Sequence, residues 1–275
     1  MSKGYLNKEE YEKYIKRVKD KTVSPTDIDN MKSNLQPLVE TQFDILSIPK
    51  DVLKAFEPSQ IGTIVGTLMD ACIPYLSILT NSDKFESLGL QKNQGNIGDR
   101  EMYPDYIHTS KKRLELKLIF VDNPNIEMKK PPTPRESSAR LTQKVTFKNV
   151  KPEDDMLLVI AYTLKERFDK PGFFSPTIID FDIFPVSNCI LERDRRMYNT
   201  NGGWFGNFET PTILSKQGKK NIKLQRELDY ASYGRKKDEH KDFNEDTNFG
   251  KLKRIPYKPL QDFIKPERYN NFFDI

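Results

Sequence analysis

The sequence predicts an α/β or α+β protein in which a mixed β-sheet is flanked by helices. Three observations indicate this fold class. The first 88 residues place apolar side chains at helical spacing, residues 113–121 alternate apolar and charged side chains, and residues 156–164 form an uninterrupted apolar run. No internal repeat and no clear boundary interrupts the chain, so helices followed by a sheet are expected to form one domain.

Composition sets limits on the class of protein. The 275 residues allow one or two domains at about 150 residues each, and 31% charged residues predict a heavily solvated surface. We expect no membrane span, because no run of about 18 apolar residues occurs. The charged start lacks an apolar signal core, and Cys72 and Cys189 are the only cysteines, so we expect a cytoplasmic protein. Two histidines exclude most histidine-based metal sites, which leaves a hard cation bound by carboxylates.

The N-terminal third is predicted to be helical. Residues 8–20 have the pattern of a short amphipathic helix, and Thr26 can cap a second helix that runs to about Ser47. Residues 59–79 are apolar nearly all round, so we expect a buried helix there that is kinked or broken at Pro74.

Strands are predicted to dominate the middle of the chain. The expected elements are a loop at 89–104, a strand at 113–121, a Pro-rich loop at 122–138, a short helix at 138–149, a strand covered on both faces at 156–164, a strand at 177–186 and a Gly- and aromatic-rich loop at 199–211.

Basic residues are clustered although the net charge is only +5, from 45 basic and 40 acidic residues. Several clusters in the second half alternate with aromatic residues, a pattern that favours a polyanionic partner over a merely solvated face. The clusters are Lys111–Arg113, Arg193–Arg196, Lys216–Arg226, Arg235–Lys237 and Lys251–Arg254.

The most informative segment runs from Tyr103 to Val121. Pro104-Asp105 is followed ten residues later by Glu115-Leu116-Lys117 on the predicted strand. Strand alternation places Glu115 and Lys117 on one face, with the leucines on the other, and Asp105 is expected at the end of a neighbouring strand across a hairpin at 108–112.

This arrangement suits metal-dependent chemistry on a phosphodiester. Two converging carboxylates, Asp105 and Glu115, can bind Mg²⁺ through oxygen. A lysine two residues beyond the second carboxylate, Lys117, can orient water or stabilise developing charge. The triplet itself is weak evidence, because Glu127-Met128-Lys129 and Glu239-His240-Lys241 repeat it outside any predicted strand, and an exposed Glu/Lys ladder on a surface hairpin explains the spacing equally well.

The residues Pro104, Asp105, Glu115 and Lys117 resemble the motif of the PD-(D/E)XK nuclease superfamily, and the chain is most similar in size and layout to a type II restriction endonuclease. The specific match covers about fifteen residues. The resemblance implies a restriction-endonuclease-like central sheet, Mg²⁺-dependent cleavage of double-stranded DNA at a short specific sequence, and a homodimer. It also implies a cognate DNA methyltransferase as a functional partner in a restriction-modification system.

Further site residues follow from this resemblance. An acid on the helix before the motif often completes the metal site, and Asp70 is the candidate, although a carboxylate there can equally face solvent or cap the break near Pro74. Asp180 and Asp182 form a rival pair that an edge strand with a wet face explains as well. His108 is more simply explained as a surface loop residue than as a phosphate contact.

We expect a single catalytic and DNA-binding domain over residues 1–275. Its helical part covers about 1–88, its nuclease core about 89–190 and its DNA-contacting part about 191–275. Donors that read base edges are expected in the loop after the motif strand and in the loop around Trp204. The candidates are Lys129, Lys130, Arg135, Arg140, Gln143, Lys144 and Asn207.

Two alternatives stay open. One is a repair or mobile-element nuclease of the same fold that reads DNA structure rather than sequence. The other is a non-catalytic nucleic-acid-binding protein in which Asp105, Glu115 and Lys117 form a surface ladder. Metal-dependent cleavage would distinguish the nucleases from the non-catalytic binding protein. Discrete cleavage products would distinguish a sequence-specific enzyme from a nuclease that reads DNA structure.

Overall fold

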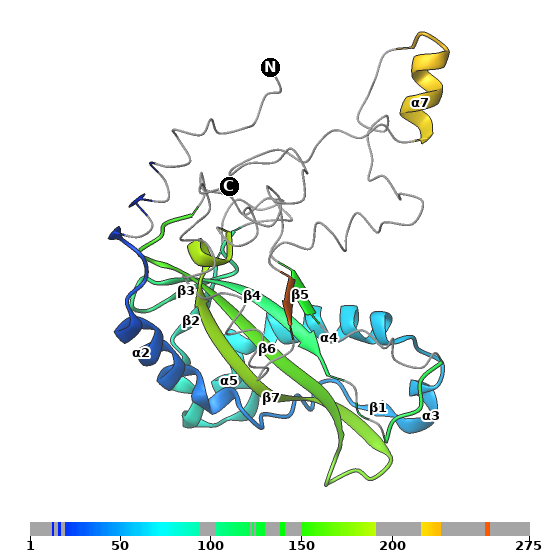
Figure 1. Cartoon of the computed structure of the whole chain (residues 1–275). Coiled ribbons are helices and arrows are strands. Elements are labelled where there is room, and N and C mark those ends of the chain that lie inside the picture. The colour runs from blue at the N-terminus through cyan, green and yellow to red at the C-terminus, as the bar shows by residue number, and fades with distance from the viewer. Residues whose placement is uncertain are drawn as a thin grey trace.

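A mixed six-stranded sheet flanked by helices forms the centre of the protein in a computed structural model, as the sequence predicts (Figure 1). The structure describes residues 13, 16, 17, 20–93, 103–121, 123, 125–129, 138–140, 150–190, 216–226 and 251–253. The strand order is β1-β7-β6-β4-β3-β2. The strands are β1 (Ile48–Pro49), β2 (Leu90–Lys92), β3 (Tyr106–His108), β4 (Arg113–Phe120), β6 (Asp155–Glu166) and β7 (Phe173–Pro185).

The direction of the strands changes across the sheet. β2, β3 and β4 are antiparallel neighbours, β4 and β6 are parallel, and β6 and β7 form a long antiparallel pair with a register shift between Ala161 and Tyr162. The hairpin predicted at 108–112 joins β3 to β4, and Lys111 turns the chain with φ 67°. The motif strand β4 therefore lies inside the sheet, with partners on both sides.

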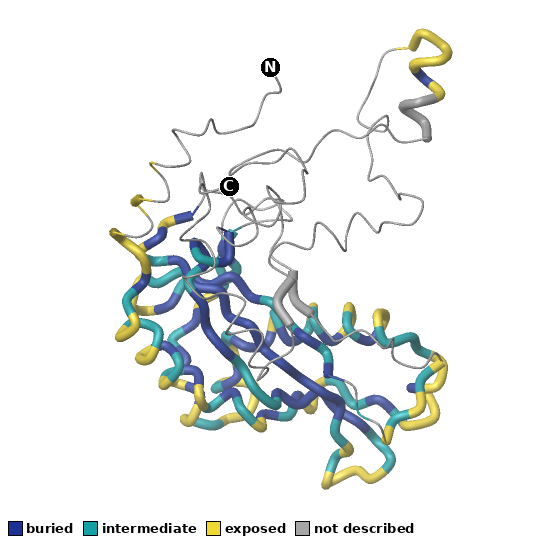
Figure 2. The backbone as a smooth tube through the Cα atoms, viewed as in Figure 1, coloured by how far each residue is buried: buried dark blue, intermediate teal, exposed yellow. Residues whose placement is uncertain are grey.

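Both faces of β6 are covered, which confirms the expectation from its uninterrupted apolar run. Met156, Leu158 and Ile160 belong to a large core on one face. Leu157 and Val159 belong to a second apolar cluster on the other face. Figure 2 shows the resulting buried band along the central strands. The side chains alternate between two cores because successive strand residues point to opposite faces.

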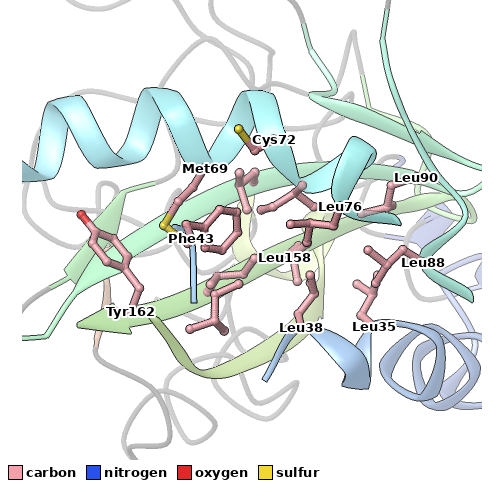
Figure 3. Close-up of a cluster of buried hydrophobic side chains, with 14 of the residues drawn as sticks. Leu35, Leu38, Phe43, Met69, Cys72, Leu76, Leu88, Leu90, Leu158 and Tyr162 are labelled. Atoms are coloured by element: carbon pink, nitrogen blue, oxygen red, sulfur yellow. The ribbon is translucent and has the colours of Figure 1, made fainter. Parts of the chain in front are cut away.

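The N-terminal helices form the cover of the larger core. They are α2 (Pro25–Leu35), α3 (Lys50–Leu53), α4 (Pro58–Cys72) and α5 (Leu76–Thr80), with 3₁₀ turns at Gln36–Leu38, Ile73–Tyr75 and Asp83–Leu88. α4 directs Met69 toward the sheet, where Leu158 and Tyr162 lie, and α2 contributes Leu35 (Figure 3). This packing fixes the end of α4 near β2 and β3, where the motif begins.

The second helix differs from its prediction at both ends. Its N-cap is Ser24, whose hydroxyl accepts a hydrogen bond from the Asp27 N–H, rather than Thr26. It ends at Leu35 rather than near Ser47. Pro37 has no N–H to continue the helix, and its ring clashes with the preceding turn. The chain beyond it instead bonds to β7, as when the Phe43 N–H donates to the Pro176 carbonyl.

The apolar segment at 59–79 is broken at Pro74 as expected, because a 3₁₀ turn separates α4 from α5. The expectation of burial all round is wrong, since Ile64, Ile78 and Leu79 are exposed. Only one side of α4 packs on the sheet. The stretch Pro58–Thr80 is long and apolar enough to cross a membrane by length and composition, contrary to the expectation of no such segment, although a core helix meets the same criterion.

In two other places the structure differs from the element that the local sequence pattern predicts. Residues 138–140, expected to start a helix, form β5 (Ser138–Arg140), which pairs with β8 (Lys251–Lys253). The loop expected at 89–104 contains β2, because Leu90 and its neighbours pair with β3. The rest of the helix at 138–149, most of the helix at 8–20 and the loop at 199–211 lie outside the described residues.

Candidate metal and active site

Asp105 and Glu115 lie side by side where β3 and β4 meet. The antiparallel register pairs Tyr106 with Leu114, so the next step brings Asp105 opposite Glu115. The Leu116 N–H donates to Asp105 Oδ2 at 2.6 Å, which fixes the carboxylate against the motif strand. The Asn93 N–H donates to the Asp105 carbonyl at 3.0 Å and its side chain to the Pro104 carbonyl at 2.9 Å, so the end of β2 holds the same segment.

Lys117 belongs to the same group. Its Nζ donates to Glu115 Oε1 at 2.6 Å and to the Leu116 carbonyl at 2.9 Å. An ammonium has three N–H donors, so one remains beyond these two bonds. Glu115 is only 7% exposed, and its Oε2 has no hydrogen-bond partner among the described residues. A solvated Glu/Lys ladder does not have a buried glutamate, so the surface-ladder explanation fails on this point.

Burial makes these carboxyl groups reluctant to ionise. Burial raises the pKa of Glu115 to about 7, with Lys117 opposing and Asp105 adding to the shift. Burial also raises the pKa of Asp105, although Lys117 and the Leu116 N–H lower it. Two carboxylates that oppose each other's ionisation, one of them with an unpartnered oxygen, form an arrangement that a divalent cation would relieve.

Oxygen ligands of this kind fit Mg²⁺. Asp105 and Glu115 supply carboxylate oxygens, the donors that a hard cation prefers, and water can complete the shell. No three acidic, histidine or cysteine side chains within the described part of the chain lie close enough to hold a metal together. Among the described residues, the motif brings together two carboxylates, those of Asp105 and Glu115.

Asp70, the candidate helix acid, lies beside the motif but is already bonded. Lys92 Nζ lies 2.5 Å from both of its carboxylate oxygens, and the Tyr106 hydroxyl donates to Asp70 Oδ1 at 2.7 Å. Both Asp70 and Lys92 influence the pKa of Asp105, which Asp70 raises and Lys92 lowers. Sequence reasoning missed Lys92. Its strand register opposite Tyr106 becomes visible only once β2 is recognised.

A second buried group supports the motif and was also missed. Asp155, fully buried at the start of β6, accepts hydrogen bonds from the Tyr103 hydroxyl at 2.5 Å and the Lys151 N–H at 2.9 Å, and Arg113 Nε lies 3.1 Å from its Oδ1. Arg113 also lies over the Tyr103 ring, 5.2 Å from its centroid. Tyr103 immediately precedes Pro104, and Arg113 lies on the same face of β4 as Glu115, so this cluster braces both halves of the motif.

The DNA-contact candidates are mostly beyond the described residues. Lys129 is exposed, and its backbone N–H donates to the Phe56 carbonyl. The backbone of Arg140 lies in β5. Lys130, Arg135, Gln143, Lys144 and Asn207 lie outside the described residues. The basic segment near 216 begins with helix α7 (Lys216–Lys223), in which Lys220 and Lys223 are exposed.

The rival sites have structural explanations. Asp182 is buried and forms an ion pair with Lys32 of α2 at 2.5 Å, so that strand face is not wet there. Asp180 accepts a hydrogen bond from the Phe181 N–H. His108 is buried rather than exposed, and Ser110 bonds its Nδ1. Neither the aspartate pair nor the histidine reaches the motif group through any described contact.

No family model, curated protein or solved structure matches the chain.

Proposed function

We propose that the protein is a Mg²⁺-dependent type II site-specific deoxyribonuclease that hydrolyses double-stranded DNA at a short sequence. One observation carries this proposal. A buried Glu115 lies beside Asp105 with an unpartnered oxygen, and Lys117 lies on the same strand face. Burying a carboxylate without full compensation is unfavourable for folding, and such groups occur most often where a site needs them.

The fold agrees with the proposal in its order of elements. Helices precede the motif, β3 and β4 form the motif hairpin, and the apolar strand β6 follows beside β4. The resemblance to PD-(D/E)XK nucleases implies this order together with a helix-bearing segment between the motif hairpin and the apolar strand, where the structure describes the strand β5 instead. The helices, the hairpin and the apolar strand are the parts that support a restriction-endonuclease-like core. The mixed sheet by itself is compatible with many functions.

Asp105 and Glu115 would hold the cation. Bound Mg²⁺ would lower the pKa of a water ligand and neutralise charge on the phosphate. The Leu116 N–H orients Asp105, and Lys117 orients Glu115 through the 2.6 Å contact. Both carboxylates are thus held by two neighbouring residues of β4, Leu116 and Lys117.

Lys117 has a second role in this proposal. Its remaining N–H donor can position the attacking water or stabilise the negative charge that develops on the phosphate. Removal of Lys117 is therefore expected to abolish cleavage while leaving DNA binding largely intact. Removal of Asp105 is expected to abolish metal-dependent activity.

We propose a homodimer acting in the cytoplasm, because a twofold assembly matches a palindromic site and cuts both strands. A cognate methyltransferase would protect the host's own sites. Donors in the loop after the motif strand would read base edges. Lysines of α7 would contact phosphates, which position the protein without reading sequence.

The test is incubation of the purified protein with unmethylated phage DNA, with Mg²⁺ or with EDTA. Discrete bands that require Mg²⁺ are expected, and mapping their ends would identify the recognition sequence. A Mg²⁺-dependent smear would indicate a nuclease that reads structure instead. DNA retarded on a gel but never cut would favour the non-catalytic binding protein.

A further inference from the structure

Asp70 is a carboxylate near the motif group, which consists of Asp105, Glu115 and Lys117, and its role is not yet assigned. It lies in the last turn of α4, one-third exposed, close enough to Asp105 to raise the pKa of that residue. A third carboxylate beside a metal site is usually taken for a third ligand. The contacts of Asp70 in this chain indicate a different partner.

The Lys92 ammonium contacts Asp70 as a bound metal ion would. Its Nζ lies 2.5 Å from both carboxylate oxygens, and 4.7 Å from the centroid of the Tyr106 ring. The Tyr106 hydroxyl donates to Asp70 Oδ1 and to the Asp70 carbonyl. Both carboxylate oxygens of Asp70 are therefore already bonded, by Lys92 from β2 and by Tyr106 from β3.

The charges of the group agree with this assignment. Asp70, Asp105 and Glu115 face the two ammonium groups of Lys92 and Lys117, which leaves one net negative charge when all are ionised. Binding of a single divalent cation would change this net charge from negative to positive. Without Lys92 the excess would be larger, and the mutual repulsion of the carboxylates would be stronger.

We infer that Lys92, rather than a metal ion, is the cation that neutralises Asp70, so that the divalent ion binds Asp105 and Glu115 alone. Asp70 is then a positioning residue that acts through Lys92: it holds the ammonium at a fixed place and limits its repulsion of the incoming cation. This inference rests on the proposed function, because it assumes that the motif carboxylates bind a divalent ion.

A double-mutant cycle tests the inference by calorimetric titration of the full chain with Mn²⁺ alone, without DNA. Asp70→Asn is expected to weaken Mn²⁺ binding roughly tenfold or more, because it leaves the Lys92 charge uncompensated beside the site. Adding Lys92→Met removes that charge, and the double variant is expected to bind within about threefold of the wild type. Methionine keeps an apolar chain over the Tyr106 ring.

The opposite assignment gives a different result. If Asp70 were a ligand, the double variant would bind Mn²⁺ as weakly as Asp70→Asn, which would overturn the inference. An Asp70→Asn variant that binds like the wild type would overturn it too. Thermal unfolding in EDTA checks that each variant folds. Should Asp70→Asn not fold, Asp70→Ser with and without Lys92→Met is read in the same way.

Failure of the proposed function has its own signature. A wild-type chain that binds no Mn²⁺, or binds it unchanged in Asp105→Asn, has no metal site on the motif, and both the function and the inference fall. A different result removes only the role of Lys92 and leaves the proposed function standing. In that case Asp105→Asn abolishes Mn²⁺ binding, and adding Lys92→Met to Asp70→Asn does not restore it.

Discussion

Glu115 is the residue on which the account of the site depends most. Its carboxylate is nearly inaccessible to solvent and has one oxygen without a hydrogen-bond partner among the described residues. The negative charge of Asp105 disfavours its ionisation. The pKa is raised from its ordinary value of 4.5 to about 7, so the folded state favours the protonated form. That preference stabilises the fold at low pH and is lost as the pH rises through about 7.

Glu115→Gln is therefore expected to stabilise the metal-free protein at pH 8 but not at pH 4.5. Glutamine keeps the shape of the side chain and cannot ionise, so between the two pH values the wild type is expected to lose more stability than the variant, by on the order of 3 kcal/mol. Urea unfolding in EDTA at each pH measures this difference. Glu127→Gln, in an exposed triplet of the same pattern, is the control and should change little at either pH.

An equal effect of Glu115→Gln at both pH values would contradict the raised pKa. It would mean that Glu115 ionises as readily in the fold as in the unfolded chain, and the argument from burial would lose its basis.

Tyr103 is the residue that ties the start of the motif to β6. Its hydroxyl donates to the fully buried Asp155 at 2.5 Å. Tyr103→Phe removes a hydrogen bond to a buried carboxylate, so we expect about 1–3 kcal/mol of destabilisation by urea unfolding. Tyr162→Phe is the matched control, because the Tyr162 hydroxyl has no hydrogen bond to a described residue and its loss should be nearly neutral. Equal destabilisation by the two changes would remove the bracing role of Asp155.

At the scale of elements, the turn before β2 depends on a glycine. Gly89 has φ +56°, and a Cβ there would lie 2.7 Å from His108 Nε2 and from Thr109 Oγ1. The Thr109 N–H also donates to the Gly89 carbonyl. A Cβ at this position would force the His108 ring and the Thr109 hydroxyl, both on the motif hairpin, to shift.

Gly89→Ala is accordingly expected to be more destabilising than Gly172→Ala. Both glycines have positive φ, so both changes carry the roughly 1–2 kcal/mol of a left-handed backbone. Only Gly89 adds the contact with His108, because a Cβ at Gly172 meets nothing within 4 Å. Thermal unfolding of the two variants checks the order, and a larger loss for Gly172→Ala would refute the role of the close approach.

Strands with a clear pattern could be predicted, and elements set by distant contacts could not. The alternating pattern of β4 and the apolar run of β6 identified both strands, because burial on the sheet dictates their side chains. The end of α2 was misplaced because an apolar stripe continues past Pro37, where the chain bonds to β7 instead. β5 pairs with a strand more than a hundred residues away, which local pattern does not reveal.

The same division holds for the candidate site. Spacing along one strand and its hairpin was enough to bring Asp105, Glu115 and Lys117 together, because register follows from a short turn. Lys92 and Asp155 reach the group across other strands, so their places depend on tertiary pairing. Sequence spacing also predicted an exposed Glu/Lys face as one possibility, whereas burial of Glu115 depends on the covering of the second sheet face.

For the whole molecule, the fold brings three separate segments to one place. The end of α4, the end of β2 and the β3–β4 hairpin meet around Asp105, and β6 supports them through Asp155 (Figure 1). A large core holds α4 against the sheet, so Asp70 on α4 and Glu115 on β4 lie on packed elements, and Asp105 directly precedes β3. Such mounting is what a site needs when its carboxylates must be held at short range.

The central claim is that this group cleaves DNA, and the rate of cleavage under single-turnover conditions tests it most directly. Unmethylated phage DNA is incubated with Mg²⁺ and wild-type protein, Asp105→Asn, Lys117→Ala or Lys165→Ala, while a gel-shift assay in EDTA follows DNA binding. Lys165 is paired with Glu40 on the surface and serves as the control. We expect cleavage by the wild type and Lys165→Ala, a loss of at least about 10²-fold in the two motif variants, and unchanged DNA binding in all four. Cleavage by Lys117→Ala at the wild-type rate, or wild-type protein that binds DNA and never cuts it, would contradict it.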